Sequence, residues 1–150
     1  MKSKIERIAE LVRKFFQGDR FAHSVGIELL EASEGKARAK LAIREVHLNA
    51  FHTVHGAAIY ALADFAGGIA ANSNGNSAVA VNCNISFLKA VSKGDLFAEA
   101  SEITNNRKLA SYIIRITDEK NDLIAIVQAL AYKKGTLPAA NDPTLAAEIR

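Results

Sequence analysis

Cysteine is almost absent from this 150-residue sequence, in which Cys83 stands alone. One cysteine cannot close an internal disulfide, so the sequence excludes the disulfide-stapled folds of small secreted proteins. Residues 1–7 mix charged and apolar side chains where a secretory signal would carry an apolar run. Both features predict a cytoplasmic protein.

The sequence also lacks a long apolar segment and a block of basic residues. The most apolar run, residues 56–71, contains Asp64 and is shorter than the roughly 20 residues of a membrane-spanning helix. The formal net charge of +3 is spread along the chain rather than gathered into a basic patch. We therefore expect no membrane or nucleic-acid partner, whereas a small polyanionic ligand remains compatible with the charge.

Hydrophobic residues make up 49% of the sequence, which is enough for one core, and we find no internal repeat. Ser3 and Glu6 form a capping-box pattern ahead of apolar residues at helical spacing, which predicts an amphipathic helix over residues 3–17. The apolar run predicts a buried helix from about residue 55 to residue 71.

Alternating apolar and polar residues predict the strands. A hairpin is expected over residues 25–43, and short connections predict that the later strands are antiparallel neighbours. These later strands are expected at residues 77–88, 95–104, 108–118 and 123–133. The sequence thus predicts an α+β fold in which an antiparallel sheet of about six strands wraps around a central buried helix. We expect a single domain over residues 1–134, followed over residues 135–150 by a linker and a short helix.

Asp64 is the most conspicuous polar residue, because it lies within the apolar helix. An ionised carboxylate is costly to bury unless other groups compensate it. The simplest interpretation is a carboxylate at a polar edge of the helix, hydrogen-bonded to a loop or paired with a lysine.

The residues upstream of Asp64 favour a catalytic interpretation. Asn49 precedes His55 and Gly56, which stand at the expected helix start. The unpaired N–H groups and the positive end of the helix dipole at this point could polarise a carbonyl oxygen. The pattern therefore predicts an oxyanion hole combined with an acidic residue.

Three short motifs, Leu48-Asn49, His55-Gly56-Ala57 and residues 61–64, resemble the signature of the PaaI-like (phenylacetate-degradation type) hotdog-fold thioesterases. The resemblance covers residues of roughly 20–134. It implies hydrolysis of acyl-CoA thioesters without a cofactor. Asp64 would be the nucleophile or general base and the Gly56 N–H the oxyanion donor. Asn49 would position water or the thioester, and His55 would shape the helix entry.

The sequence departs from this family at two positions. Ala57 replaces a second glycine, which is a mild change in a helix. Ala80 falls where some members carry a catalytic serine, so polar assistance would come from elsewhere. We expect Asn82 and Asn84, on the same strand face, to contact the substrate.

Other polar residues are candidates for binding roles. Lys89, Arg107 and Lys108 could reach the phosphates of CoA, although exposed basic residues are usually only solvated. The loop histidines match no zinc-binding pattern, so no metal is expected. Cys83 lies in residues 79–87, where every second position, including its own, is apolar. We therefore interpret it as a core residue.

Two other functions would use the same fold, namely a non-catalytic acyl-CoA-binding module and a hotdog hydratase or dehydratase. We favour the thioesterase. Gly56 and Asp64 are expected about 12 Å apart along one helix, too far to act on one carbonyl. This separation predicts a homodimer with shared active sites, and the resemblance suggests a homotetramer.

Overall fold

A computed structural model describes residues 1–137 of the chain. The predicted C-terminal helix lies outside these residues. The last strand continues to Thr136, one residue past the position where a linker was expected to begin. The helices are α1 (Lys4–Phe16), α2 (Arg20–Val25), the 3-10 turn η1 (Glu45–His47) and α3 (Gly56–Asn72), and the strands are β1 (Ile27–Ser33), β2 (Lys36–Ala42), β3 (Asn76–Phe87), β4 (Asp95–Asn105), β5 (Leu109–Asp118) and β6 (Leu123–Thr136). None of the described helices is long and apolar enough to cross a membrane.

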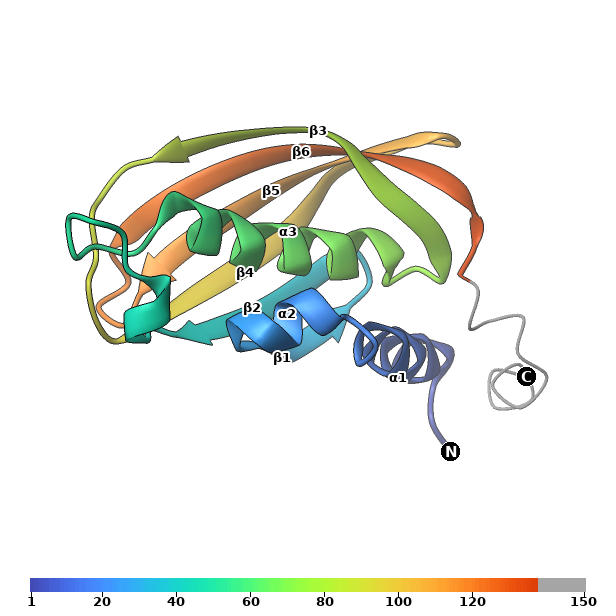
Figure 1. Ribbon diagram of the computed structural model, residues 1–150. Helices are drawn as coiled ribbons and strands as arrows, with labels where there is room; N and C mark the ends of the chain where they lie inside the picture. The colour runs from blue at the N-terminus through green and yellow to red at the C-terminus, as the bar shows by residue number, and fades with distance from the viewer. Residues whose placement is uncertain (138–150) are drawn as a thin grey trace.

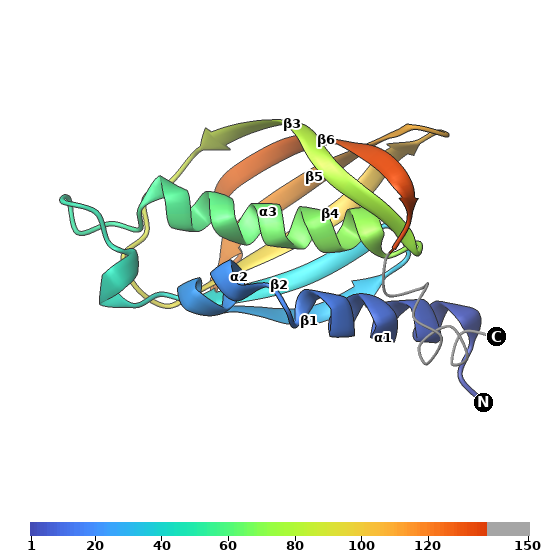
Figure 2. The same cartoon turned by 45° about the vertical axis from the view of Figure 1, so that its right-hand side comes forward.

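Helix α1 confirms the amphipathic prediction. The Ser3 side chain accepts a hydrogen bond from the Glu6 N–H, and the Glu6 carboxylate accepts one from the Ser3 N–H, so the capping box is complete. Leu11 and Val12 bury the apolar face of the helix. Figure 2 shows α1 and α2 following one another along β1.

Helix α2 corrects the hairpin predicted from residue 25. Asp19 caps its N-terminus by accepting a hydrogen bond from the Ala22 N–H, and Gly26 ends it with a φ of 88°. This left-handed conformation favours glycine, so the first strand begins only at Ile27.

The six strands form one antiparallel sheet in the order β1-β2-β4-β5-β6-β3. The predicted pairing of residues 77–88 with residues 95–104 is wrong, because β3 pairs with β6 at the edge of the sheet. The connection between β3 and β4 crosses the end of the sheet. Backbone N–H and C=O groups of this connection form hydrogen bonds with Ile124, Val54 and Ile43 in turn. The short loop therefore joins two strands that are not neighbours in the sheet.

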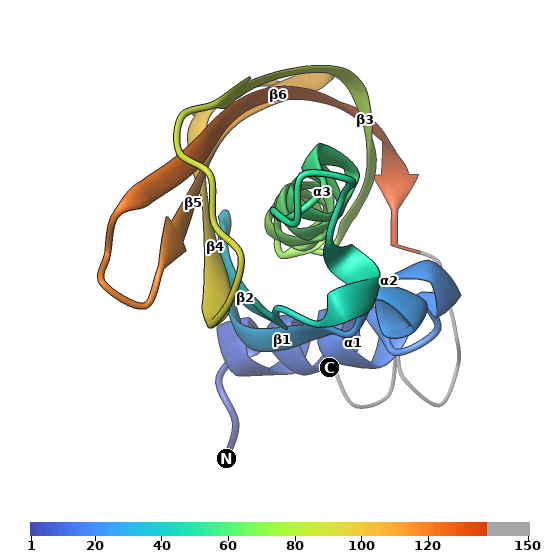
Figure 3. The ribbon, with the colours of Figure 1, turned by 60° about the vertical axis from the view of Figure 1, so that its left-hand side comes forward.

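The sheet curves around α3, as Figures 1 and 3 show. Leu62, Ala66 and Ile69 on the helix are fully buried against the concave face of the sheet, where Leu41 and Ile116 are also fully buried. This arrangement confirms the predicted central helix inside a wrapped sheet.

Strand β3 contains a bulge at Val81. Its pairing with β6 shifts between Ala80 and Asn82, which leaves Val81 as an extra residue. An extra residue reverses which side chains face the core. Ala80 therefore faces α3 before the bulge, and Cys83 faces α3 after it.

Candidate active site

His55 caps the N-terminus of α3. Its Nδ1 accepts a hydrogen bond from the Ala57 N–H at 2.9 Å, and its backbone carbonyl accepts one from the Ala58 N–H. Within the described residues, the Gly56 N–H forms no hydrogen bond. Gly56 thus presents one free donor at the positive end of the helix dipole, as an oxyanion hole requires.

His47 anchors the loop that leads into α3. It is 5% exposed. Its Nδ1 accepts a hydrogen bond from the Arg44 N–H at 2.9 Å, and its Nε2 lies 2.7 Å from the Val25 carbonyl oxygen, to which it donates. The His47 carbonyl in turn accepts the His55 N–H. In the part of the chain that the structure describes, no cluster of histidine, cysteine or acidic residues could hold a metal ion.

Asn49 organises the turn before α3. Its Oδ1 accepts hydrogen bonds from the N–H groups of Phe51 and Thr53, and its Nδ2 donates to the Thr53 hydroxyl. Within one chain its side chain is therefore engaged by its own loop. Its proposed contact with water or the thioester stays a prediction.

Asp64 lies on α3 among buried residues, but its own side chain is exposed in the single chain, which differs from the burial expected from its sequence context. Desolvation by the surrounding atoms, followed by the negative charge of Asp19, raises the pKa of Asp64 above its ordinary value. A carboxylate with a raised pKa is a better base and nucleophile than an ordinary aspartate.

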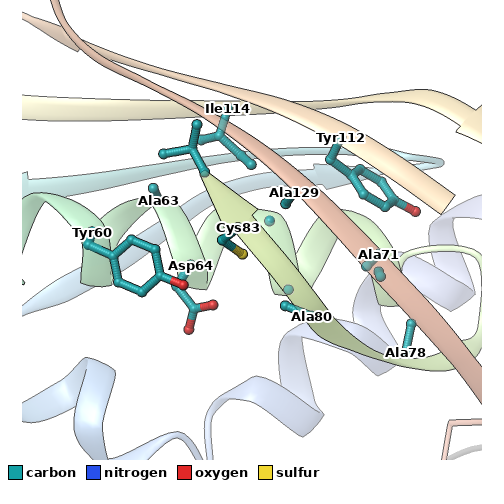
Figure 4. Close-up of a pocket in the computed structure, with 14 residues that line it drawn as sticks. Tyr60, Ala63, Asp64, Ala71, Ala78, Ala80, Cys83, Tyr112, Ile114 and Ala129 are labelled. Carbon is teal, nitrogen blue, oxygen red and sulfur yellow. The ribbon is translucent and has the colours of Figure 1, made fainter. Parts of the chain in front are cut away.

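An apolar slot extends from Asp64 between α3 and strands β3, β5 and β6 (Figure 4). The slot is small and leaves about 30 Å³ for the centre of a water-sized sphere. Tyr60, one helical turn before Asp64, lies at the same end of the slot, and Cys83 faces it from β3. A hydrogen bond with Cys83, together with partial burial, raises the pKa of Tyr60 to about 12.

Sequence reasoning missed Tyr60, whereas Cys83 packs against the core as predicted and also lines the slot. The i, i+4 spacing of Tyr60 and Asp64 places both on one helix face, which was a usable signal. Cys83 is half-buried and lines the slot, and the bulge places it on the opposite face to Val79 and Val81. No sequence pattern identified this bulge.

The predicted substrate-binding residues do not converge within one chain. Because of the bulge, Asn82 and Asn84 do not share the face of Ala80, and both are exposed on the other side of β3. Lys89 lies near Gly56 and is ion-paired with Asp122.

Arg107 and Lys108 lie in the turn between β4 and β5, at the end of the sheet near the C-terminus of α3 (Figure 1). The Lys108 ammonium lies 5.6 Å from the centre of the Tyr132 ring. One chain therefore does not bring these two residues close to Lys89, and contacts of all three with CoA stay a prediction.

Comparisons with known proteins agree with this geometry. The model of the thioesterase superfamily matches residues 51–125. A putative esterase of Archaeoglobus fulgidus is 32% identical over 133 residues, which cover 87% of this chain and 86% of that protein. The acyl-coenzyme A thioesterase PaaI of Escherichia coli is 28% identical over 121 residues, which cover 80% of this chain and 86% of that protein.

The structure of E. coli PaaI, from the phenylacetic acid degradation operon, has a TM-score of 0.85 at 26% identity and covers 89% of this chain and 98% of its own. The likeness in fold extends over the curved sheet and its central helix, which confirms the predicted hotdog fold. The chain therefore belongs to the thioesterase superfamily and is a PaaI-like hotdog thioesterase.

Proposed function

We propose that this enzyme hydrolyses acyl-CoA thioesters, with Asp64 as nucleophile or general base and the Gly56 N–H as oxyanion donor. The observation that carries the proposal is the combination on α3 of a free N–H and a carboxylate with a raised pKa at the mouth of an apolar slot. The likeness to a protein named as an acyl-CoA thioesterase supports the choice of substrate.

The reaction can follow two routes. As a base, Asp64 takes a proton from water, and the resulting hydroxide forms a C–O bond with the thioester carbon. As a nucleophile, its carboxylate oxygen attacks the carbon and forms an anhydride that water then cleaves. In both routes the carbonyl oxygen gains negative charge that the Gly56 N–H stabilises, the C–S bond breaks, and CoA leaves as a thiolate that takes up a proton.

The two catalytic groups belong to different subunits in this proposal. Gly56 and Asp64 lie on one continuous helix, and their separation of eight positions corresponds to about 12 Å along its axis. An oxyanion donor must lie about 3 Å from the oxygen that it stabilises. One carbonyl can therefore use both groups only where a second copy of α3 contributes one of them.

The surface around the N-terminus of α3 supports a dimer. Strand β3 is an edge strand of 12 residues, with Val79 and Val81 exposed, and such an edge offers unpaired backbone groups to a partner. Near the helix start, large apolar side chains are also exposed. These are Phe21, Val46, Phe51, Phe87 and Leu88. We propose a homodimer with two shared active sites. Two such homodimers pair into a homotetramer.

A hydrolysis screen over a panel of acyl-CoA thioesters tests the activity. Loss of the thioester ultraviolet absorbance is the better readout, because a thiol reagent would also react with Cys83. Wild type should release CoA, and Asp64→Asn should be nearly inactive. The absence of hydrolysis, together with binding of the acyl-CoAs, would instead support a binding module. Hydration of enoyl-CoA would support a hydratase.

Mixed dimers test the shared site. Asp64→Asn and Gly56→Pro subunits, each inactive, are unfolded together in equal amounts and refolded. Random pairing places about half of the dimers in the mixed form, in which one site carries both changes and the other carries neither. Activity should return to about a quarter of wild type. No recovery, with mixed dimers demonstrated by mass spectrometry, would place the site within one subunit.

A further inference from the structure

The Asp64 end of the slot gathers three polar side chains from two elements (Figure 4). Tyr60 and Asp64 lie one turn apart on the same face of α3. Cys83 faces them from β3, because the bulge at Val81 turns its side chain toward the helix. The slot is otherwise lined mainly by apolar side chains. Tyr60, Asp64 and Cys83 therefore form a polar cluster in apolar surroundings.

The size of the slot suits water rather than a larger group. About 30 Å³ admits the centre of a water-sized sphere. A buried water molecule needs at least about 10–15 Å³ of space and two to four polar partners. The slot is therefore large enough for water, and its Asp64 end supplies the polar partners.

Tyr60 carries the hydroxyl group that lies nearest to Asp64 among the described residues of the slot. Two of these residues have a hydroxyl group, Tyr60 and Tyr112. The Tyr112 hydroxyl lies at the other end of the slot and donates a hydrogen bond of 3.0 Å to the Glu102 carboxylate. Tyr60 is close enough to Asp64 for the charge of the carboxylate to raise the pKa of the phenol. Tyr60 is thus the slot residue that brings a hydroxyl to Asp64.

The contact with Cys83 determines how the Tyr60 hydroxyl is used. The hydrogen bond between the two side chains raises the pKa of Tyr60, as expected where the phenol keeps its proton and donates to sulfur. With its hydrogen directed to Cys83, the Tyr60 oxygen presents lone pairs that accept hydrogen bonds. Within the described chain, no hydrogen bond to the Asp64 carboxylate contributes to its pKa. Two acceptor groups therefore lie at the same end of the slot.

We propose that Tyr60 is a water-positioning residue, which holds the attacking water together with Asp64, and that Cys83 orients the Tyr60 hydroxyl. This inference rests on the proposed function and gives Asp64 the role of base. One hydrogen of the water bonds to the Asp64 carboxylate and the other to the Tyr60 oxygen. This arrangement leaves a lone pair of the water oxygen free for the thioester carbon.

The atoms balance in this step. The water oxygen forms the C–O bond while Asp64 takes the first proton. The C–S bond then breaks, and the CoA thiolate takes up the proton that Asp64 received. The second hydrogen of the water stays on the product acid. Tyr60 and Cys83 exchange no proton with the substrate, so their contribution is the orientation of the water.

The two tyrosines of the slot offer a test with a matched control. Tyr60→Phe removes the oxygen beside Asp64 and keeps the ring, whereas Tyr112→Phe removes the same atom at the other end. With the acyl-CoA that wild type hydrolyses fastest, Tyr60→Phe should lower kcat by about 10-fold, which is the upper range for one hydrogen bond, and leave KM little changed. Tyr112→Phe should keep the wild-type kcat. Thermal unfolding reports whether both variants are folded.

Substrate affinity is measured separately by calorimetry with butyl-CoA, a thioether that cannot be hydrolysed. Its Kd should be the same for wild type and Tyr60→Phe, because the Tyr60 oxygen contacts water and not the ligand. A weaker affinity that accounts for the whole loss of activity would mean that Tyr60 binds substrate, and this would overturn the inference.

Cys83 adds a readout that a purely structural role would not change. Cys83→Ala removes the acceptor of the Tyr60 hydroxyl, which then donates to Asp64 and competes with the water. This variant should lower kcat by about threefold or more, whereas Cys83→Ser keeps an acceptor and should stay near wild type. Because Cys83 acts through Tyr60, adding Cys83→Ala to Tyr60→Phe should cause no further loss.

Three further results would overturn the inference while the proposed function stands. These are an equal kcat for wild type and folded Tyr60→Phe, an equal loss of kcat in the two tyrosine variants, and an equal loss from Cys83→Ala with and without the Tyr60 hydroxyl. An acyl adduct in the intact mass of acid-quenched enzyme would show that Asp64 itself attacks, which would also overturn it. If wild type hydrolyses no acyl-CoA, the proposed function fails and the inference fails with it.

Discussion

Replacing Gly56 by proline removes one hydrogen-bond donor with little other change to the backbone. Gly56 is the first residue of α3, a position where proline is favoured because its N–H has no helical partner. The preceding residue, His55, has a φ of −59° and a ψ of 135°, an extended conformation that suits a residue before proline. The variant should therefore fold.

The substitution also adds carbon atoms, so it needs a steric control. A Cβ atom at Gly56 would lie 3.0 Å from the end of the Phe87 ring. Phe87 is exposed in the single chain and can shift by the few tenths of an ångström required. Gly56→Ala makes the same contact but keeps the N–H. The ratio of kcat between Gly56→Pro and Gly56→Ala therefore reports the effect of losing the N–H donor alone.

Loss of one oxyanion donor typically lowers kcat by about 10²–10³-fold, or about 3–4 kcal/mol. We expect Gly56→Pro to be about 10²-fold or more below Gly56→Ala in kcat, measured by loss of thioester absorbance at saturating acyl-CoA. Thermal unfolding should show that both variants are folded. Equal kcat values for the proline and alanine variants would refute the Gly56 N–H as the donor.

The remaining predictions concern four side chains. Asp64→Asn should lower kcat by about 10²-fold or more with little change in affinity, as measured by steady-state kinetics and calorimetry. Because the pKa of Asp64 is raised and the charged form acts, kcat/KM should fall as the pH drops through a value above the ordinary aspartate pKa. Folding disfavours the charged form, so Asp64→Asn should unfold at a higher temperature than wild type at pH 7 and lose this gain below about pH 4. His47→Ala should destabilise the fold by about 2–3 kcal/mol in urea, since two hydrogen bonds are lost, whereas exposed His52→Asn should not. Tyr60→Phe should slow alkylation of Cys83, because the Tyr60 hydroxyl can no longer donate a hydrogen bond to the reactive thiolate.

Local signals in the sequence were sufficient for the elements that define the fold. The capping box at Ser3 and the apolar run after His55 each depend on neighbouring residues, and both helices start where these signals place them. Helix α2 was missed because Arg20–Val25 spans fewer than two turns, too short for a helical period to stand out from strand alternation. The order of the strands was not predictable from loop length alone, because the loop before β4 crosses the end of the sheet.

The candidate site was likewise predictable from the sequence only in part. Gly56 and Asp64 were identified from local features, a helix start and a charge in an apolar run. The free N–H of Gly56 supports its assigned role, while the catalytic roles of both residues stay predictions. The slot could not be predicted, because its walls come from four elements, α3, β3, β5 and β6, that only the folded chain brings together.

The bulge at Val81 explains why the side chains of β3 that face the site could not be predicted from the sequence. A strict alternation from Val79 to Phe87 would place Val79, Val81 and Cys83 on one face. One extra residue instead leaves both valines exposed and turns Cys83 and Ala80 toward Asp64. The same shift turns Asn82 and Asn84 away, so the polar assistance expected from them has no source within the chain. The hydroxyl nearest to the Asp64 end of the slot is then that of Tyr60, whose pKa a hydrogen bond with Cys83 raises to about 12. A bulge of one residue therefore decides which side chains of β3 face the slot at Asp64.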